Sequence, residues 1–205
     1  MLSRIPGSAG TVHPVTAWAS PVLRTPCAPV ESFDGELVSL LESMFATMYA
    51  ADGVGLAANQ IGVGLRVFVY DCPDDEDVRH LGHVVNPVLV EADGVVIAGE
   101  EGCLSLPGLR AQTPRYDRAV VRGQDLTGAP VEIEGTGFFA RCLQHEAAHL
   151  DGGVFLDELS GWRRARALRA MRRADWYVPA ADVLAAGGAG AGGAGTDGAV
   201  GGSRA

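Results

Sequence analysis

The chain has 205 residues, 47% of them hydrophobic, and carries a net charge of -9. This length suits one well-packed domain, and the acidic charge argues against nucleic acid as the main partner. No segment approaches the roughly 18 consecutive apolar residues of a membrane-spanning helix. The cysteines are widely spaced, and Pro6, Gly7 and Pro14 interrupt any signal-peptide core. We therefore expect a cytoplasmic protein that contacts neither membrane nor nucleic acid.

The N-terminal half predicts a loose extension followed by a helix and a strand. Residues 1–16 are rich in Pro, Gly, Ser and Thr and lack periodicity, so we expect a loosely ordered extension before a single domain over 17–180. Apolar residues recur at helical spacing over 36–49, and Asp34 is a suitable N-cap for this helix. The segments that follow are, in order, a glycine-rich stretch, a strand and an acidic loop: 52–64, 66–70 and 74–77.

The C-terminal half predicts several strands followed by two helices. The strands are separated by the turn signals Asn86-Pro87, Asp93-Gly94 and Thr127-Gly128 and are expected at 83–90, 95–98, 119–122 and 131–133. A helix should begin near Gly137 and end near Gly152, and an arginine-rich helix should cover 162–177. The Gly/Ala-rich segment 181–205 is expected to be disordered. This order indicates an α+β fold, in which antiparallel or mixed sheets pack around the first of these two helices.

The segment 144–149, with the sequence QHEAAH, has the residues of a metal site. On a helix, residues i and i+4 lie on the same face, so His145 and His149 can bind one metal ion together. Glu146 sits about 100° round the helix from His145, where it can reach a water on that metal without being a ligand. This is the HExxH arrangement of metal-dependent hydrolases. The competing interpretation is a partly buried helix with two satisfied histidines.

A catalytic metal needs a third protein ligand and an open position for water. Asp157 and Glu158 follow the helix and are similar to the carboxylate ligand of some zinc proteases. Cys103 is the better candidate, because it lies beside Gly102 after a predicted strand, where a thiolate can project from a sharp turn. A lone cysteine can also be a small buried hydrophobic residue.

Three segments together resemble the peptide deformylase family in their order and spacing. They are GVGLAANQ at 53–60, EGCLS at 101–105 and QHEAAH at 144–149. The resemblance extends from about residue 20 to about residue 175 and includes Asn86-Pro87 and PGLR at 107–110. Members of this family are metal-dependent hydrolases that remove the N-formyl group from the N-terminal methionine of new proteins. The resemblance therefore implies that N-formylmethionyl nascent peptides are the substrates of this chain.

The resemblance also implies roles that agree with the chemistry of the residues. The implied metal ligands are Cys103, His145 and His149. The metal would lower the pKa of its water, and Glu146 would take the proton of that water and later deliver it to the leaving amine. The Gln60 side-chain amide and the backbone N–H of Leu104 would donate to the oxygen of the tetrahedral centre.

The methionine side chain of the substrate would enter an apolar pocket. The positions that match the family's substrate-binding residues are Val54, Gly55, Arg110, Phe138 and Cys142. Glycine at 53 and 55 would let a peptide approach closely and pair with this segment as an added strand. Arg110 would meet the substrate backbone downstream of methionine, or it is a surface arginine. Arg141 departs from the pattern, because some relatives have an aliphatic residue there.

One divalent metal ion is implied, and the resemblance favours Fe²⁺. A thiolate with two imidazoles also suits Zn²⁺, Ni²⁺ or Co²⁺, so the residue types alone do not choose the metal. Iron bound through an oxidisable thiolate would make the enzyme sensitive to oxygen.

Two alternatives to an active deformylase stay open at this stage. An HExxH peptidase would use a carboxylate or a third histidine in place of Cys103. A catalytically weakened binder of formyl peptides is suggested by Ala148, where the family usually has aspartate. Asp151 is then the expected substitute for that aspartate, with Arg115 as its partner. The basic helix at 162–176 is a candidate for ribosome contact or only a solvated surface.

Overall fold

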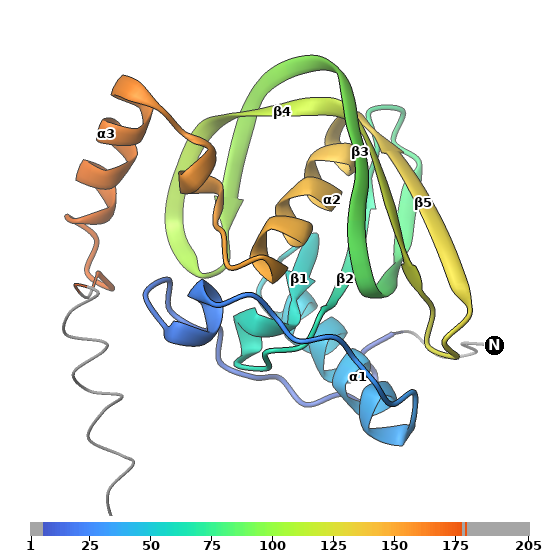
Figure 1. Ribbon diagram of the computed structural model, residues 1–205. Helices are drawn as coiled ribbons and strands as arrows, with labels where there is room; N and C mark the ends of the chain where they lie inside the picture. The colour runs from blue at the N-terminus through green and yellow to red at the C-terminus, as the bar shows by residue number, and fades with distance from the viewer. Residues whose placement is uncertain (1–5, 178, 180–205) are drawn as a thin grey trace, which may run out of the picture.

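The computed structural model describes residues 6–177 and residue 179. Within them, five antiparallel strands form one sheet in the order β1-β2-β3-β4-β5, and three α-helices accompany it (Figure 1). The strands are β1 (Gly55–Ala57), β2 (Val67–Pro73), β3 (Arg79–Cys103), β4 (Leu106–Gln124) and β5 (Pro130–Thr136). The helices are α1 (Gly35–Ala50), α2 (Gly137–Leu150) and α3 (Gly161–Met171), with 3-10 turns η1 (Pro21–Arg24), η2 (Ala58–Ile61) and η3 (Phe155–Glu158). The expected α+β class is confirmed.

The first helix begins where the sequence predicts. The Asp34 side chain caps α1 by accepting hydrogen bonds from the backbone N–H groups of Glu36 and Leu37, at 2.9 and 3.3 Å. These bonds satisfy two of the donors that a helix leaves free at its N-terminus. Residues 6–16 are more closely held than their composition indicates, because they run along α1. For example, the backbone N–H of His13 donates to the Thr47 hydroxyl at 3.0 Å.

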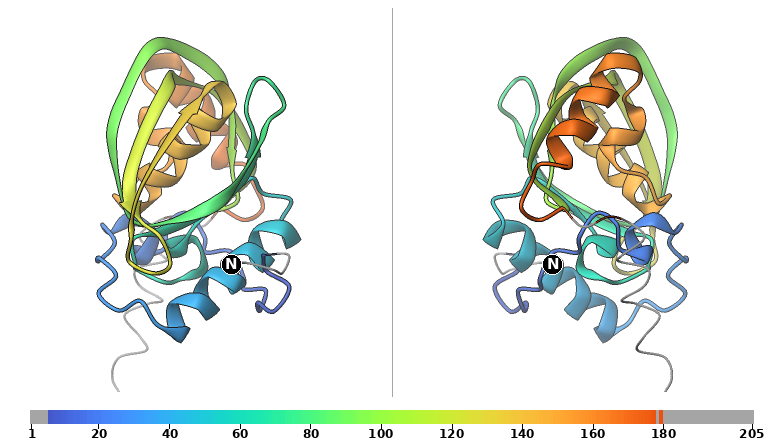
Figure 2. Two further views of the ribbon diagram at one scale, coloured as in Figure 1. Left: turned by 90° about the vertical axis from the view of Figure 1, so that its right-hand side faces the viewer. Right: turned by 90° about the vertical axis from the view of Figure 1, so that its left-hand side faces the viewer.

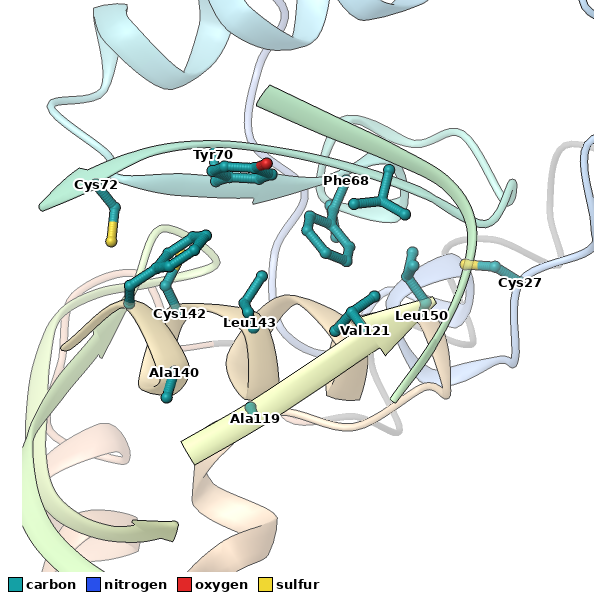
Figure 3. Packing of buried hydrophobic residues seen from close by; sticks show 13 residues of the cluster. Cys27, Phe68, Tyr70, Cys72, Ala119, Val121, Ala140, Cys142, Leu143 and Leu150 are labelled. Atoms are coloured by element: carbon teal, nitrogen blue, oxygen red, sulfur yellow. The ribbon is translucent and has the colours of Figure 1, made fainter. Parts of the chain in front are cut away.

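Strand β2 lies between α1 and α2, and both of its faces are buried (Figure 3). Phe68 and Tyr70 point toward α2 and pack in a cluster with Leu143 of that helix. Val67 and Val69 belong to a second cluster, which includes the apolar face of α1. Because successive side chains point to opposite faces of a strand, β2 contributes to two hydrophobic clusters, one on each of its faces. The cluster that contains Phe68, Tyr70 and Leu143 thus packs α2 against one face of β2.

Strands β3 and β4 form one long hairpin that arches over α2 (Figure 2). The sequence predicted separate short strands here, and two of its three turn signals are instead irregularities within β3. The pairing register shifts around Asn86 and around Gly94, which have φ values of 51° and 84°. A bulge tolerates the same positive φ as a turn, so residues that favour turns can also kink a continuing strand. Thr127-Gly128 is a true turn, between β4 and β5.

The last two helices differ in how well the sequence located them. Helix α2 covers 137–150, and Gly152, with a φ of 82°, follows its end as predicted. Helix α3 ends at Met171, so the prediction that it continues to 177 was wrong. It is anchored by Ala167 and Met171, which pack with residues of η3 and β4. The tail at 181–205 lies outside the described residues. Among the described residues, no helix has the length and apolar character needed to cross a membrane.

Candidate active site

Cys103, at the end of β3, meets two histidines that lie one turn apart on α2. One ligand atom from each of Cys103, His145 and His149 lies within 4.8 Å of the other two. The Cys103 Sγ is 3.2 Å from the His149 Nε2. The long β3–β4 arch brings the cysteine to the helix from 46 residues away in sequence. A thiolate and two imidazoles in this arrangement fit a divalent metal of the zinc or iron type.

Both imidazoles are oriented by an acceptor at their Nδ1 atom. The His149 Nδ1 is 3.1 Å from the carbonyl oxygen of Gly153, and the His145 Nδ1 is 3.1 Å from the Glu101 Oε2. A carbonyl and a carboxylate can only accept, so each Nδ1 carries the hydrogen and each Nε2 can turn its lone pair toward a metal. This second set of contacts is what metal-binding histidines require.

The two histidines differ in their affinity for a proton. Burial and the nearby charge of His145 hold the pKa of His149 well below its ordinary value. Burial also opposes the charge of His145, but hydrogen bonds with Cys103 and Glu101 and the charge of Glu146 outweigh it and raise this pKa to about 10. Metal binding at the His145 Nε2 requires the neutral ring, so it competes with a proton there.

Glu101 is a candidate functional residue that the sequence analysis quoted but did not assign, because its carboxylate contacts the His145 ring. Its Oε1 accepts from the Arg115 Nε at 3.0 Å and from the Arg141 Nη1 at 2.8 Å. Burial opposes its ionisation, yet the hydrogen bonds from His145 and Arg115 and their charges prevail and lower the Glu101 pKa to about 2. Its place two residues before Cys103 was the signal available in the sequence. Its partners come from β4 and α2, and no local pattern gives them.

Glu146 is buried beside the metal-ligand candidates. Burial raises the pKa of its carboxyl group to about 7, which is the range expected of a general base near neutral pH. Its Oε2 atom is buried and has no hydrogen-bond partner among the described residues. A Cβ atom on Gly55 would overlap the Glu146 carboxylate, so glycine at this position makes room for it. An orphaned carboxylate oxygen beside a thiol and two imidazoles fits a water held on a metal.

The side-chain amide of Gln60 lies beside the Cys103 sulfur. The backbone N–H of Ala57 donates to the Gln60 Oε1 at 2.9 Å, which fixes the orientation of the side-chain amide. The Gln60 Nε2 then points to the Cys103 Sγ at 3.5 Å and to the Ser105 hydroxyl at 3.4 Å. Leu104 follows Cys103 in the two-residue turn between β3 and β4. The side-chain amide and this turn flank the ligand sulfur.

A hollow of about 700 Å³ opens beside these groups. Every substrate-binding position implied by the resemblance lines it: Val54, Gly55, Arg110, Phe138 and Cys142. The catalytic candidates Gln60, Cys103, Leu104, His145 and Glu146 also line it. Arg110 stands at the surface and pairs with Glu100 at 3.3 Å. Arg141 belongs to the wall as well, and the sequence did not predict what it contacts.

The carboxylates after α2, Asp157 and Glu158, are not part of the cluster of ligand atoms. Asp157 pairs with Arg24 at 2.8 Å, and so the alternative third ligand is not supported. The expected partnership of Asp151 with Arg115 was wrong. Asp151 pairs with Arg66 at 2.7 Å. The Arg115 Nη1 lies 3.4 Å from the Glu158 Oε1.

Comparisons with known proteins identify the family of this chain. A sequence model described as polypeptide deformylase matches residues 12–165. The chain belongs to the peptide deformylase family. It is 66% identical over 172 residues to peptide deformylase 2 of Streptomyces avermitilis, across 84% of this chain and 92% of that protein.

Solved structures of this family share the fold. The peptide deformylase of Thermus thermophilus superposes with a TM-score of 0.72 at 41% identity, covering 85% of this chain and 96% of that one. A class I type b peptide deformylase from Acinetobacter baumannii, solved with Met-Ala-Ser bound, gives a TM-score of 0.67 at 34% identity and covers 73% and 99%. Peptide deformylases are metal-dependent hydrolases that remove the N-formyl group from nascent peptides, and this chain is an enzyme of that family.

Proposed function

We propose that Cys103, His145 and His149 hold one divalent metal ion and that Glu146 is the general base of deformylation. The observation that carries this proposal is the convergence of the three ligand atoms within 4.8 Å, with each histidine Nδ1 bound to an acceptor. A peptidase with a carboxylate ligand is less well supported, because Asp157 is engaged with Arg24.

The roles of the other residues follow from their positions. The metal, when bound, supplies Lewis-acid chemistry by lowering the pKa of a water and polarising the formyl carbonyl. Glu146, with its unpaired Oε2, accepts the proton of the attacking water and transfers it to the leaving amine. The Gln60 amide and the Leu104 N–H donate to the formyl oxygen as it gains charge. Burial of Gln60 keeps bulk water from competing for that position.

The substrate is proposed to enter along β1. Within the described sheet, β1 pairs only with β2, so its other edge is free for an extended peptide. The methionine side chain would lie in the hollow between Phe138 and Cys142, and Arg110 at its rim would meet the backbone beyond methionine. The Acinetobacter baumannii relative was solved with Met-Ala-Ser bound, which supports a peptide that begins with methionine as the ligand.

Fe²⁺ is the metal we propose for the cell, with Zn²⁺, Ni²⁺ and Co²⁺ as substitutes. The soft thiolate and the two imidazoles accept all four ions. We propose the cytoplasm as the compartment, because formylated chains are made there.

Two variants test the proposal on anaerobically purified protein, with metal content and formate release from a formyl-Met peptide measured on the same sample. Glu146→Gln should keep the metal and lose nearly all turnover, because an amide of the same shape cannot accept the proton. Cys103→Ala should lose both metal and activity, whereas the control Cys27→Ala, at a buried cysteine that does not line the hollow, should lose neither. Full metal content in Cys103→Ala would remove the thiolate from the ligand set.

We also propose that α3 contacts the ribosome, where formylated chains emerge. Its anchoring residues face the protein, and Arg166 and Arg169 are exposed. A contact made by exposed charged side chains would weaken as the salt concentration increases. Co-sedimentation with ribosomes should fall in the double variant Arg166→Gln/Arg169→Gln, while deformylation of a free peptide should not change. Unchanged co-sedimentation would leave α3 as a solvated surface.

A further inference from the structure

Arg141 lies on α2 one helical turn before His145, and its side chain is almost entirely buried, with the residue 8% exposed. Its Nη1 donates to the Glu101 Oε1 at 2.8 Å and to the carbonyl oxygen of Thr113 at 2.7 Å. Its Nη2 donates to the carbonyl oxygen of Ile97 at 2.8 Å. Burial of a guanidinium is costly unless its charge is paired and it makes hydrogen bonds, and here the charge is paired with Glu101 and the side chain donates three hydrogen bonds.

These three acceptors belong to both strands of the hairpin. Ile97 and Glu101 are on β3 and Thr113 is on β4, so one side chain of α2 joins the helix to the whole arch. Gly99 makes this possible, because a Cβ atom there would lie 2.7–3.0 Å from three guanidinium atoms of Arg141. The absence of a side chain at 99 thus leaves space that the arginine fills.

The proposed metal ligands come from the two elements that Arg141 joins. Cys103 ends β3, and the two histidines belong to α2, so the site depends on a fixed separation of strand and helix. Glu101 orients the His145 ring and is held by two arginines. Of these, Arg115 belongs to β4, and only Arg141 comes from the ligand helix itself.

We infer that Arg141 is a positioning residue of the metal centre, acting through Glu101 on His145 and through the hairpin on Cys103. The inference rests on the proposed metal ligands. It assigns the buried arginine at a pocket position to metal geometry and not to recognition of the methionine side chain. Loss of a partner that supports a metal ligand typically lowers metal affinity or activity by about 10–100-fold.

The test compares Arg141→Met, which has a similar length but no charge or donors, with Arg122→Met at an exposed arginine of β4. Co²⁺ affinity is measured by competition with a chelator, and the Co²⁺ absorption spectrum reports the ligand geometry. Melting temperatures are measured with and without Co²⁺, and kcat and KM are measured at saturating Co²⁺.

We expect Arg141→Met to weaken Co²⁺ binding by about 10–100-fold, to change the spectrum and to lower kcat more than KM. Arg122→Met should match the parent protein. Equal losses of melting temperature with and without Co²⁺, at unchanged affinity, would show that Arg141 only stabilises the fold. A higher KM at unchanged Co²⁺ affinity would assign it to the substrate pocket, and would also overturn the inference.

Gly99→Ala gives a second route to the same answer if Arg141→Met does not fold. The added methyl group should displace the guanidinium of Arg141 without removing its charge. The φ of Gly99 is not in the left-handed region, so alanine fits the backbone there. We expect Gly99→Ala to weaken Co²⁺ binding. If Arg141→Met does fold, adding Gly99→Ala to it should cause no further loss of Co²⁺ affinity. Unchanged affinity in Gly99→Ala would overturn the inference. Failure of Cys103→Ala to lose metal would instead overturn the proposed ligand set, so the two failures are distinguishable.

Discussion

The two histidines of α2 are held in different ways, although they lie one turn apart on one helix. His149 is oriented by the carbonyl of Gly153, four residues further along the chain. His145 is oriented by Glu101, which is 44 residues away and is itself held by Arg115 and Arg141. The support of His149 comes from the backbone and is present whatever the side chains are. The support of His145 depends on three charged side chains, so the two regions should respond differently to mutation.

Glu101→Gln should have the largest effect on stability and metal affinity, because it removes the carboxylate that orients His145 and pairs with both arginines. The amide cannot neutralise two buried arginines, and removal of one partner of a buried ion pair costs about 3–5 kcal/mol. Metal affinity should also fall by about 10–100-fold. Denaturant unfolding of the metal-free protein and chelator competition measure the two effects separately. Glu100→Gln is the matched control, since that side chain is exposed at the rim. Equal behaviour of the two variants would contradict the proposed role of Glu101.

The pH dependence should separate the two carboxylates next to His145. Glu101, with a pKa lowered to about 2, contributes stability that is present above its ordinary pKa of 4.5 and is lost as the pH falls toward 2. Glu146, with a pKa raised to about 7, must be ionised to act as base, so activity should rise with pH through this range. A bound cation would favour the ionised form and move this limb to lower pH. Activity should thus fall on acidification while the fold persists. Loss of structure and activity at the same pH would contradict the assignment.

Gly153→Ala tests the backbone contact that orients His149, and it should have a small effect on stability and metal affinity. The carbonyl that accepts from His149 remains in any residue at this position. The new Cβ atom would lie 3.1 Å from the Ala148 carbonyl oxygen, so a slight shift is needed. We expect a change in stability of about 1 kcal/mol or less and a loss of metal affinity below about tenfold. A loss as large as that of Glu101→Gln would show that the His149 side is equally sensitive.

The same comparison explains what the sequence could predict. Helix α2, its end near Gly152 and the pair His145 and His149 follow from local spacing and local backbone preferences. The positions of Arg115 and Arg141 around Glu101 depend on how the β3–β4 arch closes over α2, which no local pattern contains. The arch itself was predicted as separate strands because bulge residues and turn residues share the same conformations. The sequence pattern favoured Cys103 over Asp157 and Glu158 as the third ligand, and the family resemblance supported that choice and supplied Gln60.

Asp151→Asn should have the smallest effect, and it tests the idea that this residue replaces an aspartate missing at Ala148. Asp151 pairs with Arg66 at the surface, and its side chain is 68% exposed. Exposed ion pairs of this kind contribute about 0–1 kcal/mol. Arg66 keeps its hydrogen bonds to the carbonyl oxygens of Leu150 and Pro87, so the end of α2 stays attached in the variant.

The measurements are thermal unfolding and Co²⁺ affinity, with Glu158→Gln as the comparison. Glu158 is the carboxylate that faces Arg115, so its loss acts on the network around Glu101, whereas loss of Asp151 does not. We expect unchanged Co²⁺ affinity in Asp151→Asn and a larger, though still modest, decrease in Glu158→Gln, because the Glu158 side chain is itself 45% exposed. A drop of about tenfold or more in Asp151→Asn would mean that the C-terminal turn of α2 also depends on side-chain charges. The contrast between the two histidines would then be lost, since both ends of the ligand helix would rely on ion pairs.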